Sequence, residues 1–185
     1  MFWPWESLPS GPGPASGNKA GPSSLYVSFR FDFTEMMNQL CEIGNFIRRL
    51  RVQLRFGELS REPLRLLRLE WRDDTAICDW IARSPDKWDK DLTRQMGEHY
   101  ASLQALEDAI AVRHLLFLTL PDVSTAQIRV YRQPADQPPE LIITGMVTRN
   151  ERVSPHDPSL AMRAKLYGFQ FRLEEGKLET LECEE

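Results

Sequence analysis

The stretch from Leu67 to Trp80, LRLEWRDDTAICDW, constrains the fold most strongly, because its pattern fixes both a turn and a register. Apolar and polar residues alternate on both sides of Asp73-Asp74, which is typical of two half-buried strands. A two-residue turn at these aspartates pairs Arg72 with Thr75 and continues outward from there. The apolar residues of both strands then share one face: Leu67, Leu69, Trp71, Ala76, Cys78 and Trp80. This agreement of pattern and register predicts a β-hairpin.

The same register assigns structural roles to the acidic residues of the hairpin. Asp73 and Asp74 become turn residues, and Asp79 faces Arg68 across the two strands, which is a mildly stabilising pair. Cys78 points toward the core, where a thiol behaves as a small apolar group. We therefore interpret this acidic stretch as a turn with charged edges and predict no metal or acid–base site in it.

Two longer segments change from a period of two to the helical period. In residues 32–54, apolar residues recur at alternating steps of four and three: Met36, Leu40, Ile43, Ile47, Leu50 and Leu54. Such a seam predicts a helix and also suits pairing with another helix. A second helix is predicted from Pro85, with Ser84 as its N-cap and Pro121 as its stop.

Further alternating segments predict strands at 25–33, 126–133, 140–149, 166–174 and 177–182, the last two joined at Glu175-Gly176. The order begins β-α-β-β-α-β, as in ferredoxin-like folds, and continues with about three further antiparallel strands. We expect an α+β fold with two long helices on one sheet face, and a secretion-chaperone-like arrangement is the alternative. Residues 25–185 are expected to form a single domain, preceded by a disordered Pro/Gly/Ser-rich leader at 1–24.

Chain length, net charge and cysteine content limit the class of protein more than its activity. A chain of 185 residues fits one domain with a tail, and a net charge of -4 does not indicate a general polyanion binder. No apolar run is long enough to cross a bilayer, so no membrane association is expected. The cysteines Cys41, Cys78 and Cys183 lie far apart, which favours reduced thiols and a cytoplasmic location.

Two local clusters are candidate binding elements. Arginines crowd the last turns of the first helix and could contact an anion or the phosphates of a nucleic acid: Arg48, Arg49, Arg51 and Arg55. The same positions also suit cations at the negative end of a helix. In the leader, Phe2, Trp3 and Trp5 form an aromatic cluster that is a candidate docking motif, although tails of this composition usually stay solvated.

No catalytic, cofactor-binding or metal-ligating residues are predicted. His99 and His114 are too far apart on one helix to share a metal, and Glu98-His99 lacks the second histidine of a zinc-protease helix. Glycines are scattered singly and form no phosphate-binding loop. We expect a non-catalytic adaptor or accessory subunit that binds another protein or itself. The alternatives are a nucleic-acid-binding protein that uses the arginine cluster, and an enzyme whose site assembles only in space.

Overall fold

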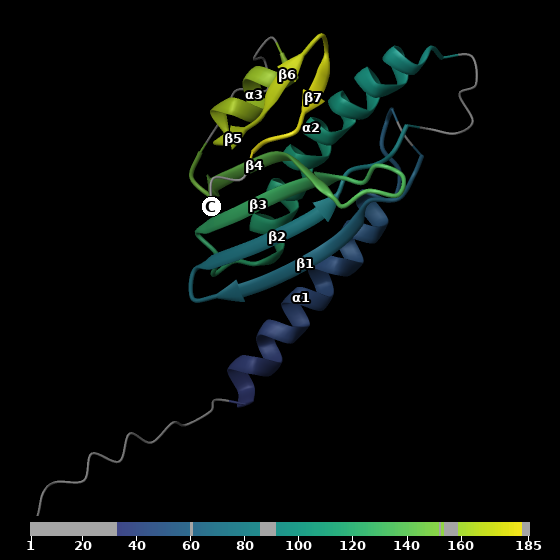
Figure 1. The fold of residues 1–185 in the computed structure, drawn as a ribbon. Helices are drawn as coiled ribbons and strands as arrows, with labels where there is room; N and C mark the ends of the chain where they lie inside the picture. The colour runs from purple at the N-terminus through teal and green to yellow at the C-terminus, as the bar shows by residue number, and fades with distance from the viewer. Residues whose placement is uncertain (1–32, 60, 86–91, 152, 154–158, 183–185) are drawn as a thin grey trace, which may run out of the picture. The chain divides into compact units, whose positions relative to one another are not determined.

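The computed structural model describes residues 33–59, 61–85, 92–151, 153 and 159–182. Within them a mixed sheet joins five strands in chain order (Figure 1): β1 (Arg65–Arg72), β2 (Thr75–Ile81), β3 (Thr125–Arg132), β4 (Glu140–Thr148) and β5 (Phe169–Gln170). Three helices of the described residues accompany this sheet, so the predicted α+β class is confirmed. The leader with Phe2, Trp3 and Trp5 lies outside the described residues. So does the strand predicted at 25–33, except for Phe33.

β1 and β2 form the predicted hairpin, and its five pairs nearest the turn have the predicted register. The register then shifts, and Trp80 pairs with Leu66 instead of Leu67. Leu67 is the extra residue of a β-bulge, and it is 48% exposed. Leu66 packs against the core in its place. The predicted inward position of Leu67 is therefore wrong.

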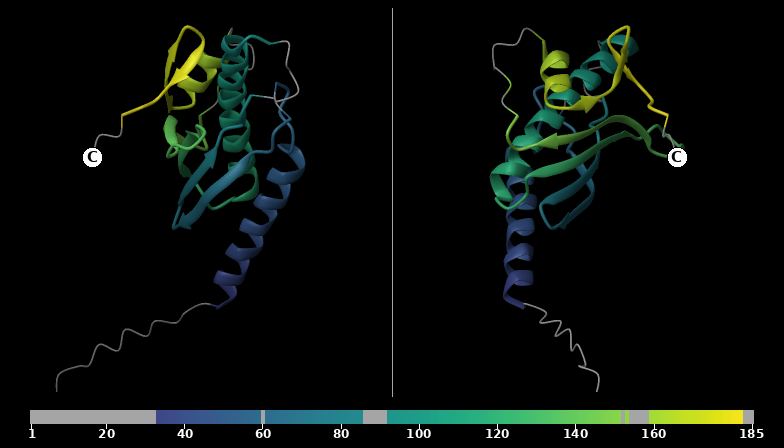
Figure 2. Two further views of the ribbon diagram at one scale, coloured as in Figure 1. Left: turned by 45° about the vertical axis from the view of Figure 1, so that its right-hand side comes forward. Right: turned by 90° about the vertical axis from the view of Figure 1, so that its left-hand side faces the viewer.

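β2 and β3 are neighbouring parallel strands, and α2 (Arg94–Thr119) connects them across the back of the sheet in Figures 1 and 2. The helix begins later than predicted, because its N-cap is Thr93, whose Oγ1 accepts a hydrogen bond from Met96 N–H at 3.3 Å. Ser84 is therefore not the cap, whereas the predicted stop at Pro121 fits the observed end. Since the strands are parallel, both of their carboxyl ends lie at the same edge of the sheet.

The direct pairing of β2 with β3 decides how far the sheet matches the predicted topology. In a ferredoxin-like order, another strand lies between the two parallel strands that each helix connects. Here β2 and β3 pair without interruption from Thr75↔Thr125 to Ile81↔Tyr131, which leaves no place for a strand between them. The observed sheet therefore fits the ferredoxin-like order only loosely.

The C-terminal segment differs from its prediction. The strand predicted at 166–174 divides into the end of α3 (Leu160–Leu166), then β5, then β6 (Arg172–Glu174). α3 is capped by Ser159, whose Oγ accepts from Met162 N–H at 3.1 Å. β6 pairs with β7 (Lys177–Glu179) in a separate hairpin, and the predicted turn at Glu175-Gly176 is confirmed, with φ of 49° and 81°.

α1 (Phe33–Gln53) confirms the first predicted helix. Phe46 and Leu50 bury its C-terminal half in the same apolar cluster that joins α2 to the sheet. The largest fully buried side chains come from several elements: Trp80, Phe46, Phe169, Leu106, Leu116, Ile128 and Ile143. This shared core packs α1, α2 and the sheet together.

Candidate functional site

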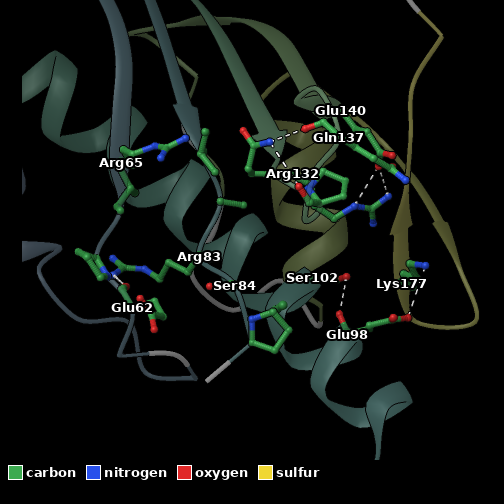
Figure 3. A pocket seen from close by; sticks show the side chains of 18 of the residues that line it. Glu62, Arg65, Arg83, Ser84, Glu98, Ser102, Arg132, Gln137, Glu140 and Lys177 are labelled. Atoms are coloured by element: carbon green, nitrogen blue, oxygen red, sulfur yellow. Dashed lines mark hydrogen bonds and ion pairs between the residues drawn. The ribbon is translucent and has the colours of Figure 1, made fainter. Parts of the chain in front are cut away.

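A cleft of about 830 Å³ opens where β2 and β3 end (Figure 3). Its walls come from the strand ends at 81–85 and 132–134, the N-terminal half of α2, Lys177 on β7, and the segment 62–65 that enters β1. In open α/β sheets, ligands bind beyond the carboxyl ends of parallel strands, and the start of the connecting helix contributes to the site. The position and size of this cleft make it the candidate site.

Arg83 lines the cleft, but its guanidinium is engaged in an ion pair and in hydrogen bonds within the protein. Its side chain is 0% exposed, and its Nε lies 2.7 Å from Asp108 Oδ2 on α2. The same guanidinium donates to the carbonyls of Leu54 and Glu62, each at 2.5 Å, and so holds the chain that leaves α1. Burial raises the pKa of the Asp108 carboxyl, and the hydrogen bond from Arg83 opposes that rise. We assign this buried pair a structural role.

Glu98 contacts two cations at the cleft. Its Oε1 lies 2.9 Å from Arg94 Nε, and its Oε2 lies 3.4 Å from Lys177 Nζ, so one carboxylate serves both α2 and β7. The hydrogen bond from Arg94 is the main cause that lowers the pKa of Glu98. Because the Arg94 side chain is still 91% exposed, solvent screens this ion pair strongly.

A second ion pair joins β3 to β4 at the cleft, as the dashed lines in Figure 3 show. Arg132 Nη2 lies 2.6 Å from Glu140 Oε2, and Arg132 Nη1 donates to the Leu178 carbonyl at 2.9 Å. Thr180 adds a hydrogen bond to the same carboxylate at 3.0 Å. The hydrogen bond from Arg132 is the main cause that lowers the pKa of Glu140. Glu98 and Glu140 therefore favour the ionised form.

Arg65 differs from the other cleft cations. It is the exposed first residue of β1, and it takes part in none of the ion pairs among the described residues. Ser102, a hydroxyl of the same cleft, is already engaged, since it donates to the Glu98 carbonyl at 2.8 Å and accepts from Leu178 N–H at 3.0 Å. Arg65 is thus a cleft side chain that is available to bind a negatively charged group.

The predicted arginine cluster lies on the last turns of α1 and just beyond them, and it does not line the cleft. All four members are exposed: Arg48, Arg49, Arg51 and Arg55. Arg48 Nη1 lies 3.4 Å from Asn45 Oδ1, and the Arg55 guanidinium lies 5.1 Å from the centre of the Phe56 ring. No ion pair of the described residues includes any of the four, so an anion has access to them.

The apolar seam of α1 divides into two halves. The C-terminal half is covered, since Phe46 and Leu50 are buried and Ile47 packs against the core. In the N-terminal half the seam residue Leu40 is 54% exposed, and Met37, which lies beside the seam, is 43% exposed. Figure 1 shows this half of the helix extending away from the sheet. We call it the exposed half of α1, residues 36–43.

Asp79 lies opposite Arg68 on the neighbouring strand as predicted, but its charge partner is different. Arg129 on β3 holds its carboxylate with two hydrogen bonds, at 2.9 Å and 2.7 Å. Arg68 instead pairs with Glu70 on its own strand at 2.6 Å. Arg68 and Asp79 lie opposite each other as predicted, but the charge pair predicted between them is wrong, because the parallel neighbour β3 brings a closer cation. Cys78 faces the core as predicted, and burial raises the pKa of its thiol.

Both helix histidines have nearby partners. His99 Nδ1 lies 2.8 Å from the Gly176 carbonyl oxygen, and His114 Nε2 lies 3.2 Å from Tyr167 Oη. Throughout the part of the chain that the structure describes, His, Cys, Asp and Glu side chains form no group of three that could hold a metal ion. None of the helices described there has the length and apolar character of a membrane span.

The cleft residues were missed by sequence reasoning. The charged ones come from several strands, from α2 and from connections: Glu62, Arg65, Arg83, Arg94, Glu98, Arg132, Glu140 and Lys177. What most of them share is a position at a strand end or in the first turns of a helix. These positions can be recognised as parts of one site only once β2 and β3 are known to be parallel neighbours.

Comparison with known proteins identifies no relative: no family model, no curated protein and no solved structure matches the chain. Functional inference therefore starts from the geometry of the cleft and of α1.

Proposed function

We propose that the protein is a non-catalytic adaptor or accessory subunit that binds a protein through the exposed half of α1. The observation that supports this is the contrast between the two halves of α1: Phe46 and Leu50 are buried in the C-terminal half, whereas Met37 and Leu40 are exposed in the N-terminal half. Because both side chains of the N-terminal half are about half exposed already, a partner that covers them gains roughly half of the 1.5–3 kcal/mol that full burial of an exposed side chain gives. The exposed half of α1 is thus a favourable docking surface.

An amphipathic helix is the partner that fits this surface best. The steps of four and three along Met36, Leu40 and Ile43 match the spacing at which two helices interdigitate. A second copy of the chain carries the same row, and antiparallel pairing of two copies is self-complementary. We therefore propose a second copy as the occupant, with a helix of a different protein as the alternative.

Site-specific photo-crosslinking in the full-length chain tests this proposal. A photoreactive phenylalanine analogue in place of Leu40 should give a discrete adduct of two chains, whereas the same analogue in place of Val52 should not. Val52 is a matched control, since it is also apolar and is 73% exposed, but it lies on the opposite side of α1 from Leu50.

Each outcome of the crosslinking experiment is informative. A discrete adduct with a different protein, formed from position 40 alone, supports docking and replaces the second copy as partner. An adduct to residues 25–32 of the same chain would mean that the protein covers its own seam, and it would overturn the proposal. Equal yields from positions 40 and 52 would also overturn it.

The exposed arginine cluster supports a second candidate function, nucleic-acid binding. Arg48 and Arg51 are three residues apart on α1, and Arg55 follows just beyond the end of the helix. If they contact phosphates, affinity for RNA or DNA falls steeply with salt, and each Arg→Gln replacement lowers the slope by roughly one unit. Filter binding at several salt concentrations measures this slope. A slope that is unchanged in the triple Gln variant would reject the cluster as a nucleic-acid site.

Besides docking through α1 and nucleic-acid binding, we make several further proposals. They are a cytoplasmic location, a removable leader at 1–24, a single domain at 25–185, and a docking role for Phe2, Trp3 and Trp5. Placement of both long helices on one face of a sheet with a ferredoxin-like start is also proposed. An enzyme whose site assembles in space is the remaining alternative for the function.

A further inference from the structure

We propose that the cleft at the ends of β2 and β3 binds a small organic acid, whose phosphate or carboxylate group contacts Arg65. This site is separate from the docking surface, because no residue of the exposed half of α1 lines it. Its volume of about 830 Å³ falls within the roughly 300–1,000 Å³ that is usual for small-molecule sites. The cleft is therefore large enough for a metabolite-sized ligand.

The charges of the cleft leave a positive surplus. Arg83 does not contribute to it, because Asp108 neutralises that guanidinium inside the core. Among the residues that the structure describes, the remaining lining has four cationic side chains against three carboxylates: Arg65, Arg94, Arg132 and Lys177 against Glu62, Glu98 and Glu140. Glu98 is shared between two of these cations, and Arg65 pairs with no carboxylate of the described residues. An acidic ligand group supplies the missing negative charge.

The start of α2 adds to this surplus. Arg94 is the first residue of the helix, where the macrodipole is positive and a cation is unfavourable. The first turn contains no acidic residue that would neutralise this end. Main-chain N–H groups at a helix start also attract anions.

The carboxylates of the cleft restrict the type of acid. Glu98 and Glu140 stay ionised at neutral pH, since Arg94 and Arg132 lower the pKa of each. They repel a polyanion, but they can accept hydrogen bonds from hydroxyl or amino groups. The lining therefore fits a small molecule with one acidic group and several hydroxyl or amino groups, and disfavours a nucleic-acid strand.

Titration of the full-length, nitrogen-15-labelled protein with three matched probes tests the site by NMR. Glycerol 3-phosphate and glycerate differ in their acidic group, and glycerol lacks one. At least one acid should cause saturable shifts of the amide signals of Ala82, Arg94 and Gln133, and glycerol should not. The absence of saturable shifts with either acid up to about 10 mM, well above a Kd of 1 mM, would overturn the proposal.

Two arginines on one strand provide the matched variants. Arg65→Gln removes the proposed anchor and should raise the Kd about tenfold, as expected for the loss of a charge-assisted hydrogen bond. Arg72→Gln, at the other end of β1 and with its side chain 83% exposed, should leave the Kd unchanged. Lys177→Gln should also weaken binding. Equal weakening by the Arg65 and Arg72 variants would show only general attraction, and the site would be rejected.

Discussion

The two ends of the parallel pair β2–β3 are built differently. Where both strands begin, the Asp74 carbonyl accepts from Ser124 and Thr125 N–H at 2.8 Å and 3.2 Å, and Asp74 Oδ2 accepts from the Ser124 hydroxyl at 2.6 Å. Arg149 holds the nearby end of α2 by donating to the carbonyls of Phe117 and Leu120, each at 2.6 Å. Where both strands end, charged side chains line an open cleft instead.

This difference distinguishes two uses of arginine. Arg149 and Arg83 each donate to several main-chain carbonyls, so their hydrogen-bonding capacity is consumed inside the protein. Arg65 has no ion pair among the described residues, and the Arg94 side chain is 91% exposed. Exposure and free donors, rather than the residue type, therefore identify the arginines that can meet a ligand.

The largest effect on stability is expected from breaking the buried pair that lies behind the cleft. Arg83→Met leaves Asp108 charged and unpaired, which should reduce the free energy of unfolding by about 3–5 kcal/mol. The double variant Arg83→Met/Asp108→Leu should recover part of this loss, since no charge is then buried alone. Urea unfolding measures both. A loss below about 1 kcal/mol in the single variant would contradict the structural role of Arg83.

A smaller loss in the free energy of unfolding is expected at the end where β2 and β3 begin, which we call the closed end. Arg149→Met removes a charged donor from the carbonyls of Phe117, Leu120 and Val123, which should cost about 2–3 kcal/mol. Arg72→Gln is the control, since it replaces an exposed arginine and should change the free energy of unfolding by less than about 0.5 kcal/mol. Equal values for the two variants in urea unfolding would mean that Arg149 does not hold the end of α2.

The turn at the closed end should show a pH-dependent effect. Hydrogen bonds from Ser124 and Thr75 lower the pKa of Asp74 in the folded protein. Its contribution is therefore complete above the unfolded pKa of about 3.9 and disappears as the pH falls through the lower folded value. The melting temperature of Asp74→Asn should thus approach that of the wild type in acid. A constant difference between about pH 6 and pH 3 would contradict this assignment.

The smallest effect on the melting temperature is expected at Asp73, the residue before Asp74. This residue has a φ of 54°, a left-handed conformation that Asn adopts as readily as Asp. Asp73→Asn should therefore leave the melting temperature unchanged. Asp73→Val is the informative companion, because a β-branched residue is strained at this φ and should lower the melting temperature clearly.

The hairpin shows how far the sequence predicts the fold. A period of two with a tight turn gives the register near Asp73 and Asp74, because a slip by one residue would expose the apolar face. The bulge changes the phase of the pattern: Leu69 and Trp71 are odd positions, whereas Leu66 is even. Two adjacent leucines, Leu66 and Leu67, hide this change, since either one could face the core.

The cleft could not be predicted from the same patterns. Arg65 and Lys177 line the same cleft because β2 and β3 pair in parallel and β7 folds back toward their ends, and no local period encodes such distant pairing. The partner of Asp79 was missed for the same reason, since Arg129 comes from β3. α3 was missed because its seven residues are too few to show a helical period against the strand pattern that follows.

The most direct test of the division between the two ends compares their arginines in one experiment. Urea unfolding should be measured for the triple variant Arg65→Gln/Arg94→Gln/Lys177→Gln and for Arg149→Met. We expect the cleft variant to stay within about 1 kcal/mol of the wild type, as for exposed residues, while Arg149→Met loses at least twice as much. A cleft variant that loses as much as Arg149→Met would show that the cleft charges hold the fold, and would contradict the account.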